Sequence, residues 1–148
     1  MKMSDTRALA HARGAMKIAE VALAVVCLVV YRHYKLSFGG TDSAAADRYI
    51  VGIVTFGGML LVSGPLLLAY IRSPAGIVNY YTPFLEVIYN VIGFVLFLTV
   101  GGLVLEHYKG HLKPLTGNEP GVALGAICII NSVIYLIDAS LAIKQGLE

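Results

Sequence analysis

Four long apolar runs dominate this chain and constrain what it can fold into. They cover residues 16–34, 49–72, 84–107 and 121–143. At a rise of about 1.5 Å per residue, helices of this length extend roughly 29–36 Å, enough to cross a hydrocarbon core of about 30 Å. A mean hydropathy of +0.77, with 57% hydrophobic and 14% charged residues, disfavours a soluble all-α fold. We therefore predict an all-α integral membrane protein, a four-helix bundle with short loops.

The connectors between the runs are short, so no second domain is expected. A single membrane domain covers residues 1–148, and residues 1–15 are predicted to form a cytosolic basic tail. The first run follows a basic stretch, as the apolar part of a signal peptide does. It ends at Val30-Tyr31-Arg32 without a small-residue cleavage pattern, which predicts a retained signal anchor.

The basic residues give a prediction of orientation. Four spans place both termini on one side, and a cytosolic location for them puts six Lys and Arg residues inside against five outside. The six are Lys2, Arg7, Arg13, Lys17, Arg72 and Lys144. Four of them precede or open the first span, which usually sets orientation, so both termini are predicted to be cytosolic. This basic start could also lie as a short interfacial helix on anionic lipid, but a positive flank is the favoured interpretation.

Other chemistries find little support in the sequence. The net charge of +2 is spread over both sides of the predicted membrane, so no nucleic-acid partner is expected. We see no nucleophile elbow, phosphate-binding loop or Cys/His pair, and we predict neither an enzyme nor a cofactor. His107 and His111 have a spacing that can hold a metal, but no third ligand accompanies them and no metal site is predicted. Cys27 and Cys128 fall inside apolar runs and are interpreted as small packing residues.

Three acidic residues lie inside the predicted spans. Glu20 is near the start of the first, Glu86 near the start of the third and Asp138 near the end of the fourth, so all three share one depth at the cytosolic end. A carboxylate in a bilayer is costly unless it is paired, hydrated or neutral. Lys17, Arg72 and Lys144 are available as counter-ions at this level.

Two of these acids belong to polar stripes at helical spacing. Asn90 follows Glu86 by four residues, and Asn131 precedes Tyr135 and Asp138 by four and seven. One interpretation is a proton or ion relay. The favoured one is that these groups hold helices together through hydrogen bonds of about 0.6–2 kcal/mol each.

Glycine provides a second signal for helix packing. The chain has 16 glycines. Small-residue seams are formed by Gly57 and Gly58 with Gly64, by Gly93 with Gly101 and Gly102, and by Gly121 with Gly125. Such seams let helices approach closely. The seams alone do not show whether they pack helices within the bundle, join copies of the chain into a homo-oligomer, or contact partner proteins. Use within the bundle is favoured.

The last two runs resemble those of a known family. Residues 89–102, Tyr-Asn-Val-Ile-Gly-Phe-Val-Leu-Phe-Leu-Thr-Val-Gly-Gly, continuing to His107-Tyr108, resemble the third helix of the Snakeskin family of arthropods. Residues 121–130, Gly-Val-Ala-Leu-Gly-Ala-Ile-Cys-Ile-Ile, with Tyr135-Leu136-Ile137-Asp138 after them, are similar to its fourth helix. Four spans, short loops and a basic residue after the first helix complete the likeness. MARVEL-like four-span membrane proteins are a broader group that the chain also resembles.

The resemblance implies a plasma-membrane component of smooth septate junctions, which seal the paracellular route of epithelia. Its partners would be membrane lipids and other junction proteins, a Mesh-like adhesion protein and a tetraspanin. It supplies no catalytic residues. The short first outer loop, residues 37–42, and the long cytosolic tail depart from the family pattern. Claudins and tetraspanins fit less well, because the chain lacks Trp and has no loop cysteines.

Two functions follow from these observations. The first is a structural junction component that contributes to the paracellular barrier by lateral assembly in its own membrane. The alternative is a small transporter or channel accessory subunit that uses the intramembrane acids Glu20, Glu86 and Asp138.

Overall fold

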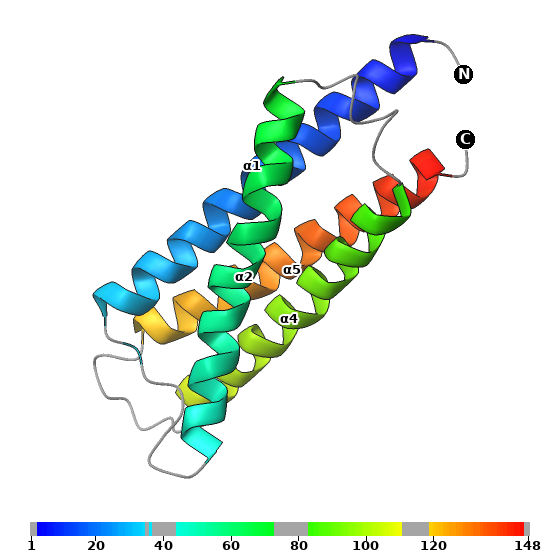
Figure 1. The fold of residues 1–148 in the computed structure, drawn as a ribbon. Coiled ribbons are helices and arrows are strands. Elements are labelled where there is room, and N and C mark those ends of the chain that lie inside the picture. The colour runs from blue at the N-terminus through cyan, green and yellow to red at the C-terminus, as the bar shows by residue number, and fades with distance from the viewer. Residues whose placement is uncertain (1–2, 35, 37–43, 73–82, 111–118, 147–148) are drawn as a thin grey trace.

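The chain folds as a bundle of four long helices (Figure 1). The computed structural model describes residues 3–34, 36, 44–72, 83–110 and 119–146. The helices are α1 (Met3–His33), α2 (Ala44–Arg72), α4 (Pro83–Gly110) and α5 (Glu119–Gly146). They run alternately in opposite directions, so the start of α1 and the end of α5 lie at the same end of the bundle, called here the terminal end. The first outer loop, residues 37–42, lies outside the described residues.

All four helices are long and apolar enough to cross a membrane. The candidate spans are His11–His33, Ala46–Arg72, Phe84–Tyr108 and Glu119–Lys144, with 23 to 27 residues each. At about 1.5 Å per residue they extend roughly 35–40 Å, somewhat more than a hydrocarbon core. The structure therefore confirms the predicted all-α bundle of four membrane-spanning helices.

Local sequence explains where several helices begin. Pro83 opens α4 and Pro120 is the second residue of α5. Proline is well tolerated in the first turn, where its missing N–H has no partner to lose. Pro65 is different, because it lies inside α2. The helix nevertheless continues through Gly64-Pro65 to Arg72, so this dipeptide does not divide the span.

Helix α1 begins earlier than the apolar pattern indicates. It starts at Met3, within the segment that we predicted to be a basic tail before residue 16. The candidate span of this helix begins at His11. The segment contains Ala8, Ala10, Ala12 and Ala15, and alanine has the highest intrinsic helix propensity. The basic segment from residue 3 to residue 15 is thus part of the same helix as the first apolar run.

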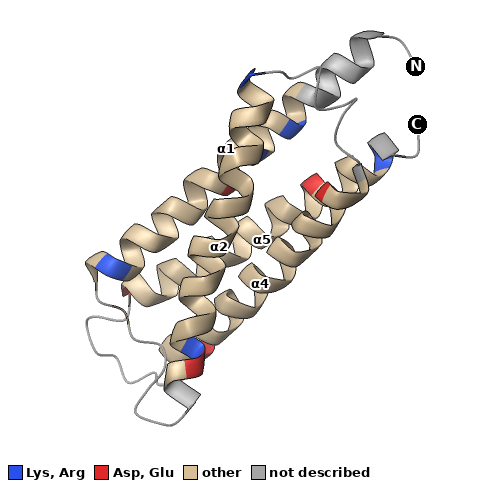
Figure 2. Cartoon of the chain, in the orientation of Figure 1, with Lys and Arg blue, Asp and Glu red and all other residues tan. Residues whose placement is uncertain are grey.

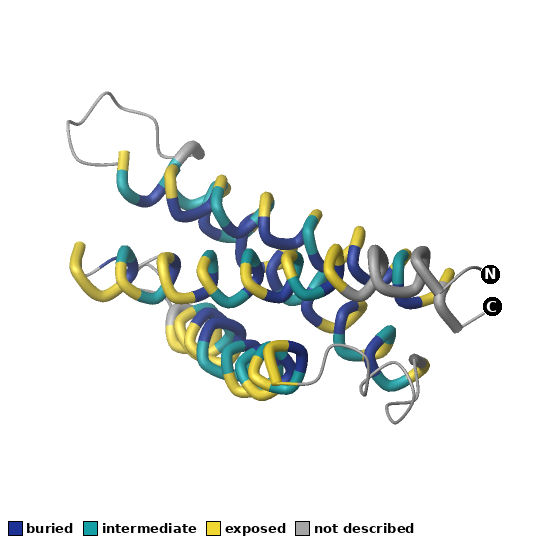
Figure 3. Tube along the Cα trace, turned by 90° about the horizontal axis from the view of Figure 1, so that it is seen from above, coloured by how far each residue is buried: buried dark blue, intermediate teal, exposed yellow. Residues whose placement is uncertain are grey.

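The buried positions follow a heptad-like rhythm. Along α1 they are separated alternately by four and three residues: Arg13, Lys17, Glu20, Ala24, Cys27 and Tyr31. This spacing keeps one narrow seam facing the bundle, as in left-handed helix packing. Figure 3 shows the result, with buried segments turned inward and exposed ones outward along each helix. The outward surface is rich in Val, Ile and Leu, as a lipid-facing surface requires.

The helices form a ring in which α1 packs on α2 and α5, and α4 packs on α5 and α2. The α4–α5 contact is the most extensive of these. An aromatic stack crosses the middle of the bundle, with ring centroids 6.0 Å apart for Phe56 and Phe97 and 5.6 Å apart for Phe97 and Tyr135. Aromatic rings at such separations attract each other beyond their burial.

Glycines explain the close approach of α4 and α5. A Cβ atom placed on Gly93 would lie 2.7 Å from the Tyr135 ring, and one on Gly125 would lie 2.7 Å from the Leu105 side chain. Gly121 lies equally tightly against the ring of Tyr108. These three predicted packing glycines therefore face the interior of the bundle, where a larger side chain would separate the two helices.

The three seam glycines predicted on the second span have different surroundings. An added Cβ at Gly57, Gly58 or Gly64 would meet no heavy atom within 4 Å. Within the described chain, α2 does not use these positions to pack on another helix.

Candidate functional site

A cluster of charged side chains lies buried in the terminal half of the bundle. Three helices supply it, each through residues at the heptad-like seam positions. Its members, called here the ion cluster, are Arg13, Lys17 and Glu20 on α1, Glu86 and Asn90 on α4, and Asp138 on α5. Each side chain is at most 3% exposed.

Lys17 is the centre of the cluster. Its Nζ lies 2.7 Å from Asp138 Oδ2, 2.9 Å from Glu20 Oε2 and 2.6 Å from Asn90 Oδ1. The ammonium group has three protons to donate, and these three acceptors come from three different helices. Lys17 therefore joins α1, α4 and α5 through charge-assisted hydrogen bonds.

Arg13 supplies the second positive charge, one turn nearer the terminal end. Its guanidinium lies 2.5 Å from Glu86 Oε2 and 3.4 Å from Asp138 Oδ1. It also stands over the ring of Tyr70, with 5.8 Å between Cζ and the ring centroid. The planar fork of arginine suits such a site, because it can contact carboxylates of two helices and an aromatic face of a third.

Hydroxyl groups connect α2 to the ion cluster. Tyr70 donates its OH to the Glu86 carboxylate, at 3.1 and 3.2 Å from the two oxygens. Ser63 donates to Glu20 Oε2 at 3.2 Å and shares a 2.8 Å hydrogen bond with the Tyr135 hydroxyl. Asn90 completes the arrangement by donating to Asp138 Oδ2 at 2.8 Å. All four helices are thus linked at one level.

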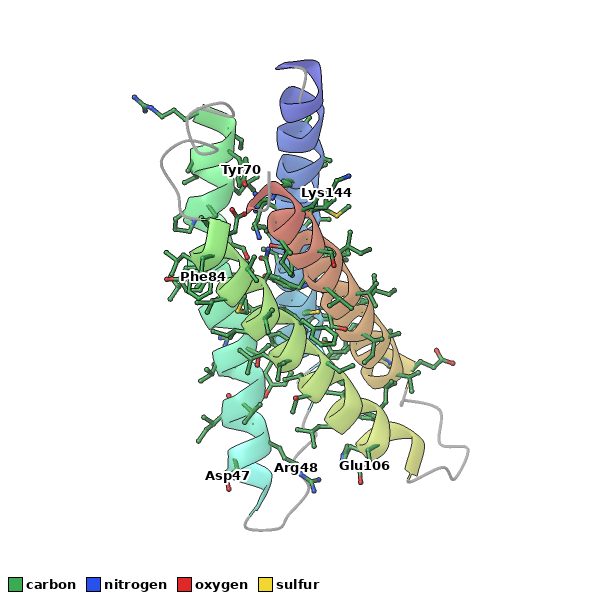
Figure 4. The ribbon with its side chains drawn as sticks, turned by 90° about the vertical axis from the view of Figure 1, so that its right-hand side faces the viewer. Asp47, Arg48, Tyr70, Phe84, Glu106 and Lys144 are labelled. Carbon is green, nitrogen blue, oxygen red and sulfur yellow. The ribbon has the colours of Figure 1, made fainter. Side chains whose placement is uncertain are left out.

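The cluster lies in one half of the predicted membrane. Glu86 is two residues inside the first residue of its span, Phe84, and Asp138 is six residues before the last residue of its span, Lys144. Glu20 is nine residues inside, about 14 Å along the helix. Figure 4 shows Tyr70 and Lys144 at the terminal end and Asp47, Arg48 and Glu106 at the other. Figure 2 shows the long uncharged middle of α4 and α5 between the two ends.

The physical effect of this arrangement is to specify how the helices fit together. The attraction between two buried ions offsets the free energy of hydration that they lose only when their geometry and hydrogen bonds are good. A shift of α1, α4 or α5 by one turn would leave a buried charge without its partner, which is strongly destabilising. The ion cluster therefore helps to fix the register of these three helices, and hydrogen bonds from Tyr70 and Ser63 connect α2 to them.

The structure brings together the acids that the sequence placed at one depth. Glu20, Glu86 and Asp138 share one network, and Lys17 is a counter-ion as expected. Arg72 and Lys144, the other expected counter-ions, are instead exposed near the ends of α2 and α5.

Sequence reasoning missed Arg13, which was assigned to the tail. A signal was present, because Arg13, Lys17 and Glu20 have the i, i+4, i+7 spacing that identified the stripe of Asn131, Tyr135 and Asp138. That stripe is also buried, and Asn131 donates to the backbone oxygen of Glu20 at 3.4 Å. The basic start of α1 and the polar stripe of α5 thus face each other.

The two cysteines lie against each other inside the bundle. The Sγ atoms of Cys27 and Cys128 lie 3.8 Å apart, both as buried free thiols between α1 and α5. In the part of the chain that the structure describes, no three His, Cys, Asp or Glu residues are placed to hold a metal ion.

The chain is similar to two known proteins along most of its length. The chain is 26% identical to Protein snakeskin of Drosophila melanogaster, over 86% of this chain and 85% of that protein. It is 27% identical to Protein snakeskin of Bombyx mori, over 86% of this chain and 88% of that protein. The chain is a Snakeskin-like four-span protein.

The Snakeskin likeness covers nearly the whole of both relatives, so it includes all four helices and not only the last two. No protein-family model matches the chain. No solved structure is significantly similar to it.

Proposed function

We propose that this Snakeskin-like protein is a structural component of the smooth septate junction. It contributes to the paracellular barrier of an epithelium by assembling laterally with other proteins of its own plasma membrane. The observation that carries the proposal is the similarity to two Snakeskin proteins along nearly their full lengths. We assign the protein no catalytic activity and no cofactor.

The architecture supports lateral assembly as the mechanism. The segments between helices are short, residues 34–43, 73–82 and 111–118, so there is little chain outside the membrane to bridge two cells. The ion cluster joins the helices internally and leaves their outer surfaces for other contacts. The extracellular reach would then come from a partner, and the family resemblance points to a Mesh-like adhesion protein and a tetraspanin.

The outer face of α2 is the best candidate contact surface. Gly57, Leu61, Gly64 and Leu68 follow one another at spacings of four, three and four residues, which places them on one face of the helix. Leu61 is 79% exposed and Leu68 is 68% exposed. The two glycines that alternate with these leucines have open space where a side chain would project. A partner helix can approach the backbone closely at such positions.

The predicted contact role is thereby divided between two groups of residues. Gly93, Gly121 and Gly125 pack inside the bundle, as do Asn90, Asn131 and Asp138, and these are not offered to a partner. Gly57 and Gly64 remain as partner-contact residues.

The function is tested by localisation and depletion. A tagged protein expressed in a polarised arthropod epithelium is expected to collect at cell contacts, and its depletion is expected to let a tracer dye pass between cells. Uniform distribution over the cell surface together with an intact dye barrier would refute the proposal.

The contact face is tested by substitution of its glycines. The Gly57→Leu and Gly64→Leu variants are expected to lose co-purification with junction partners while they remain folded, because nothing inside the bundle is displaced. Gly102 on α4 is the matched control, since it is exposed and also has no heavy atom within 4 Å of an added Cβ. Equal partner recovery for all three Leu variants would exclude this face of α2.

The burial of three acids in one half of the membrane favours a second candidate function, a transporter or channel accessory subunit. Flux of protons or ions into liposomes would be measured for the native protein and for the Asp138→Asn variant. A pH-dependent flux that falls in the variant would support this function. Unchanged flux after replacement of Glu20, Glu86 and Asp138 together would exclude it, and their ion pairs with Arg13 and Lys17 make the structural role our first choice.

A further inference from the structure

We propose that the ion cluster binds one exchangeable proton, which the Glu20 carboxyl holds beside the side chain of Asn131. The inference concerns the bundle itself and does not depend on the proposed junction function. It rests on the charge count of the cluster and on two buried acceptor atoms that have no hydrogen-bond donor.

The charges of the cluster do not balance. Arg13 and Lys17 bring two positive charges, whereas Glu20, Glu86 and Asp138 bring three negative ones when all are ionised. One negative charge is therefore in excess, among side chains that are at most 3% exposed. An uncompensated charge in a membrane interior is costly. One bound proton would make the cluster neutral.

Two of the three carboxylates already have both oxygens engaged. Asp138 Oδ1 faces Arg13, and its Oδ2 receives Lys17 and Asn90. Both oxygens of Glu86 accept from Tyr70, and Arg13 also contacts Oε2. Neither acid therefore has a carboxylate oxygen without a partner, where a bound proton would supply a missing hydrogen bond.

Glu20 differs from the other two acids. Its Oε2 accepts from Lys17 and Ser63, but its Oε1 is buried without a hydrogen-bond partner. Asn131 Oδ1 is a second buried oxygen without a partner. The Asn131 amide nitrogen contacts the backbone oxygen of Glu20 at 3.4 Å, so this side chain lies next to Glu20. A buried acceptor left without a donor is a measurable cost.

A proton on Glu20 Oε1 removes both defects together. It cancels the excess charge and converts an acceptor into a donor that Asn131 Oδ1 can receive, directly or through one bound water. The groups that face Glu20 are Lys17 on its own helix, Ser63 on α2, and Asn131, Tyr135 and Asp138 on α5. Lys17 keeps its bond to Oε2 in the protonated form.

Infrared spectroscopy of the protein in lipid bilayers tests the proposal. A protonated carboxylic acid has a C=O stretch separate from the amide and carboxylate bands. At neutral pH the native protein is expected to show one such band, which shifts on labelling with ¹³C-glutamate and not with ¹³C-aspartate. Absence of the band, or a shift with the aspartate label, overturns the proposal. A water that satisfied both oxygens without a proton would leave no band.

Two variants assign the band to one residue. Glu20→Gln is expected to remove it while the protein stays folded, because the neutral amide can also donate to Asn131. Glu106→Gln is the matched control, since Glu106 is exposed near the opposite end of the bundle, and the band should persist there. Should Glu20→Gln fail to fold, Asn131→Leu serves instead, and the band should move to the position of a less hydrogen-bonded acid. A band unchanged in these Glu20 or Asn131 variants contradicts the assignment.

Discussion

Replacement of Lys17 by Met should be among the most destabilising single substitutions in this protein. Methionine fills a similar volume but removes the ammonium that lies 2.7 Å from Asp138 and 2.9 Å from Glu20. The cluster would then hold one cation against three acidic side chains. The expected result is a large fall in the free energy of unfolding.

The size of this fall in the free energy of unfolding follows from two opposing contributions. At an effective dielectric constant of about 20, the unit charges of Lys17 and Asp138, 2.7 Å apart, attract by about 6 kcal/mol. Against this, the ammonium regains several kcal/mol of solvation when the protein unfolds. Removal of one partner of a buried ion pair accordingly costs about 3–5 kcal/mol, a large part of the stability of a typical domain.

The assay is reversible unfolding in mixed micelles or bicelles, with the free energy measured for four proteins. Lys144→Met is the matched control, because Lys144 is exposed near the same end of the bundle, and it should leave stability unchanged. Addition of Asp138→Asn to Lys17→Met leaves one cation and two acidic side chains, so the acids again outnumber the cations by one as in the native cluster, and it should recover roughly half of the loss. Equal stabilities for the Lys17 and Lys144 variants would refute the reasoning.

Three further predictions test other parts of the structure. Gly125→Leu should destabilise the bundle by about 2 kcal/mol or more in the same unfolding assay, because an added Cβ would lie 2.7 Å from Leu105 and overpacking costs are of that order. Gly102→Leu is the control and should leave the stability unchanged. Cys27 and Cys128 should resist a maleimide in bilayers and react after denaturation in detergent, because both are buried; labelling of the folded protein would show that the α1–α5 seam opens. Epitope tags at the two termini should be accessible from the same side of the membrane, which we expect to be the cytosol, and tags on opposite sides would contradict four spans.

The sequence was sufficient to predict the number and kind of helices, because apolar length against bilayer thickness is a strong constraint. It also placed Glu20, Glu86 and Asp138 at one level, since helical rise converts sequence position into depth. What it could not supply was the pairing between helices. Spacing shows which residues share a face, but not which face of a second helix it meets.

Arg13 illustrates this limit. From the sequence alone it belongs to a polar segment before the first apolar run, where basic residues usually flank a membrane. Only the three-dimensional arrangement shows that Arg13 contacts Glu86 on α4 and Asp138 on α5. With Arg13 and Lys17 assigned to buried ion pairs, four of the six basic residues counted at the terminal end remain, against five at the opposite end. The cytosolic location of the termini therefore stays a prediction.

The glycines show a related limit. A small-residue seam predicts close approach without naming the neighbour. Gly93 and Gly125 have theirs inside the bundle, whereas Gly57 and Gly64 have open space. The same motif thus has two roles in one chain, and only the three-dimensional arrangement separates them.

The central structural claim is that two basic residues of α1, Arg13 and Lys17, enter the membrane bundle and pair with acids from the later helices. Solid-state NMR of protein in lipid bilayers, with ¹⁵N-lysine and ¹³C-aspartate labels, measures this contact directly. The account predicts a close correlation between the Lys17 ammonium nitrogen and the Asp138 carboxyl carbon, lost in both Lys17→Met and Asp138→Asn. A spectrum without a lysine–aspartate correlation, or one that survives both substitutions, would contradict it.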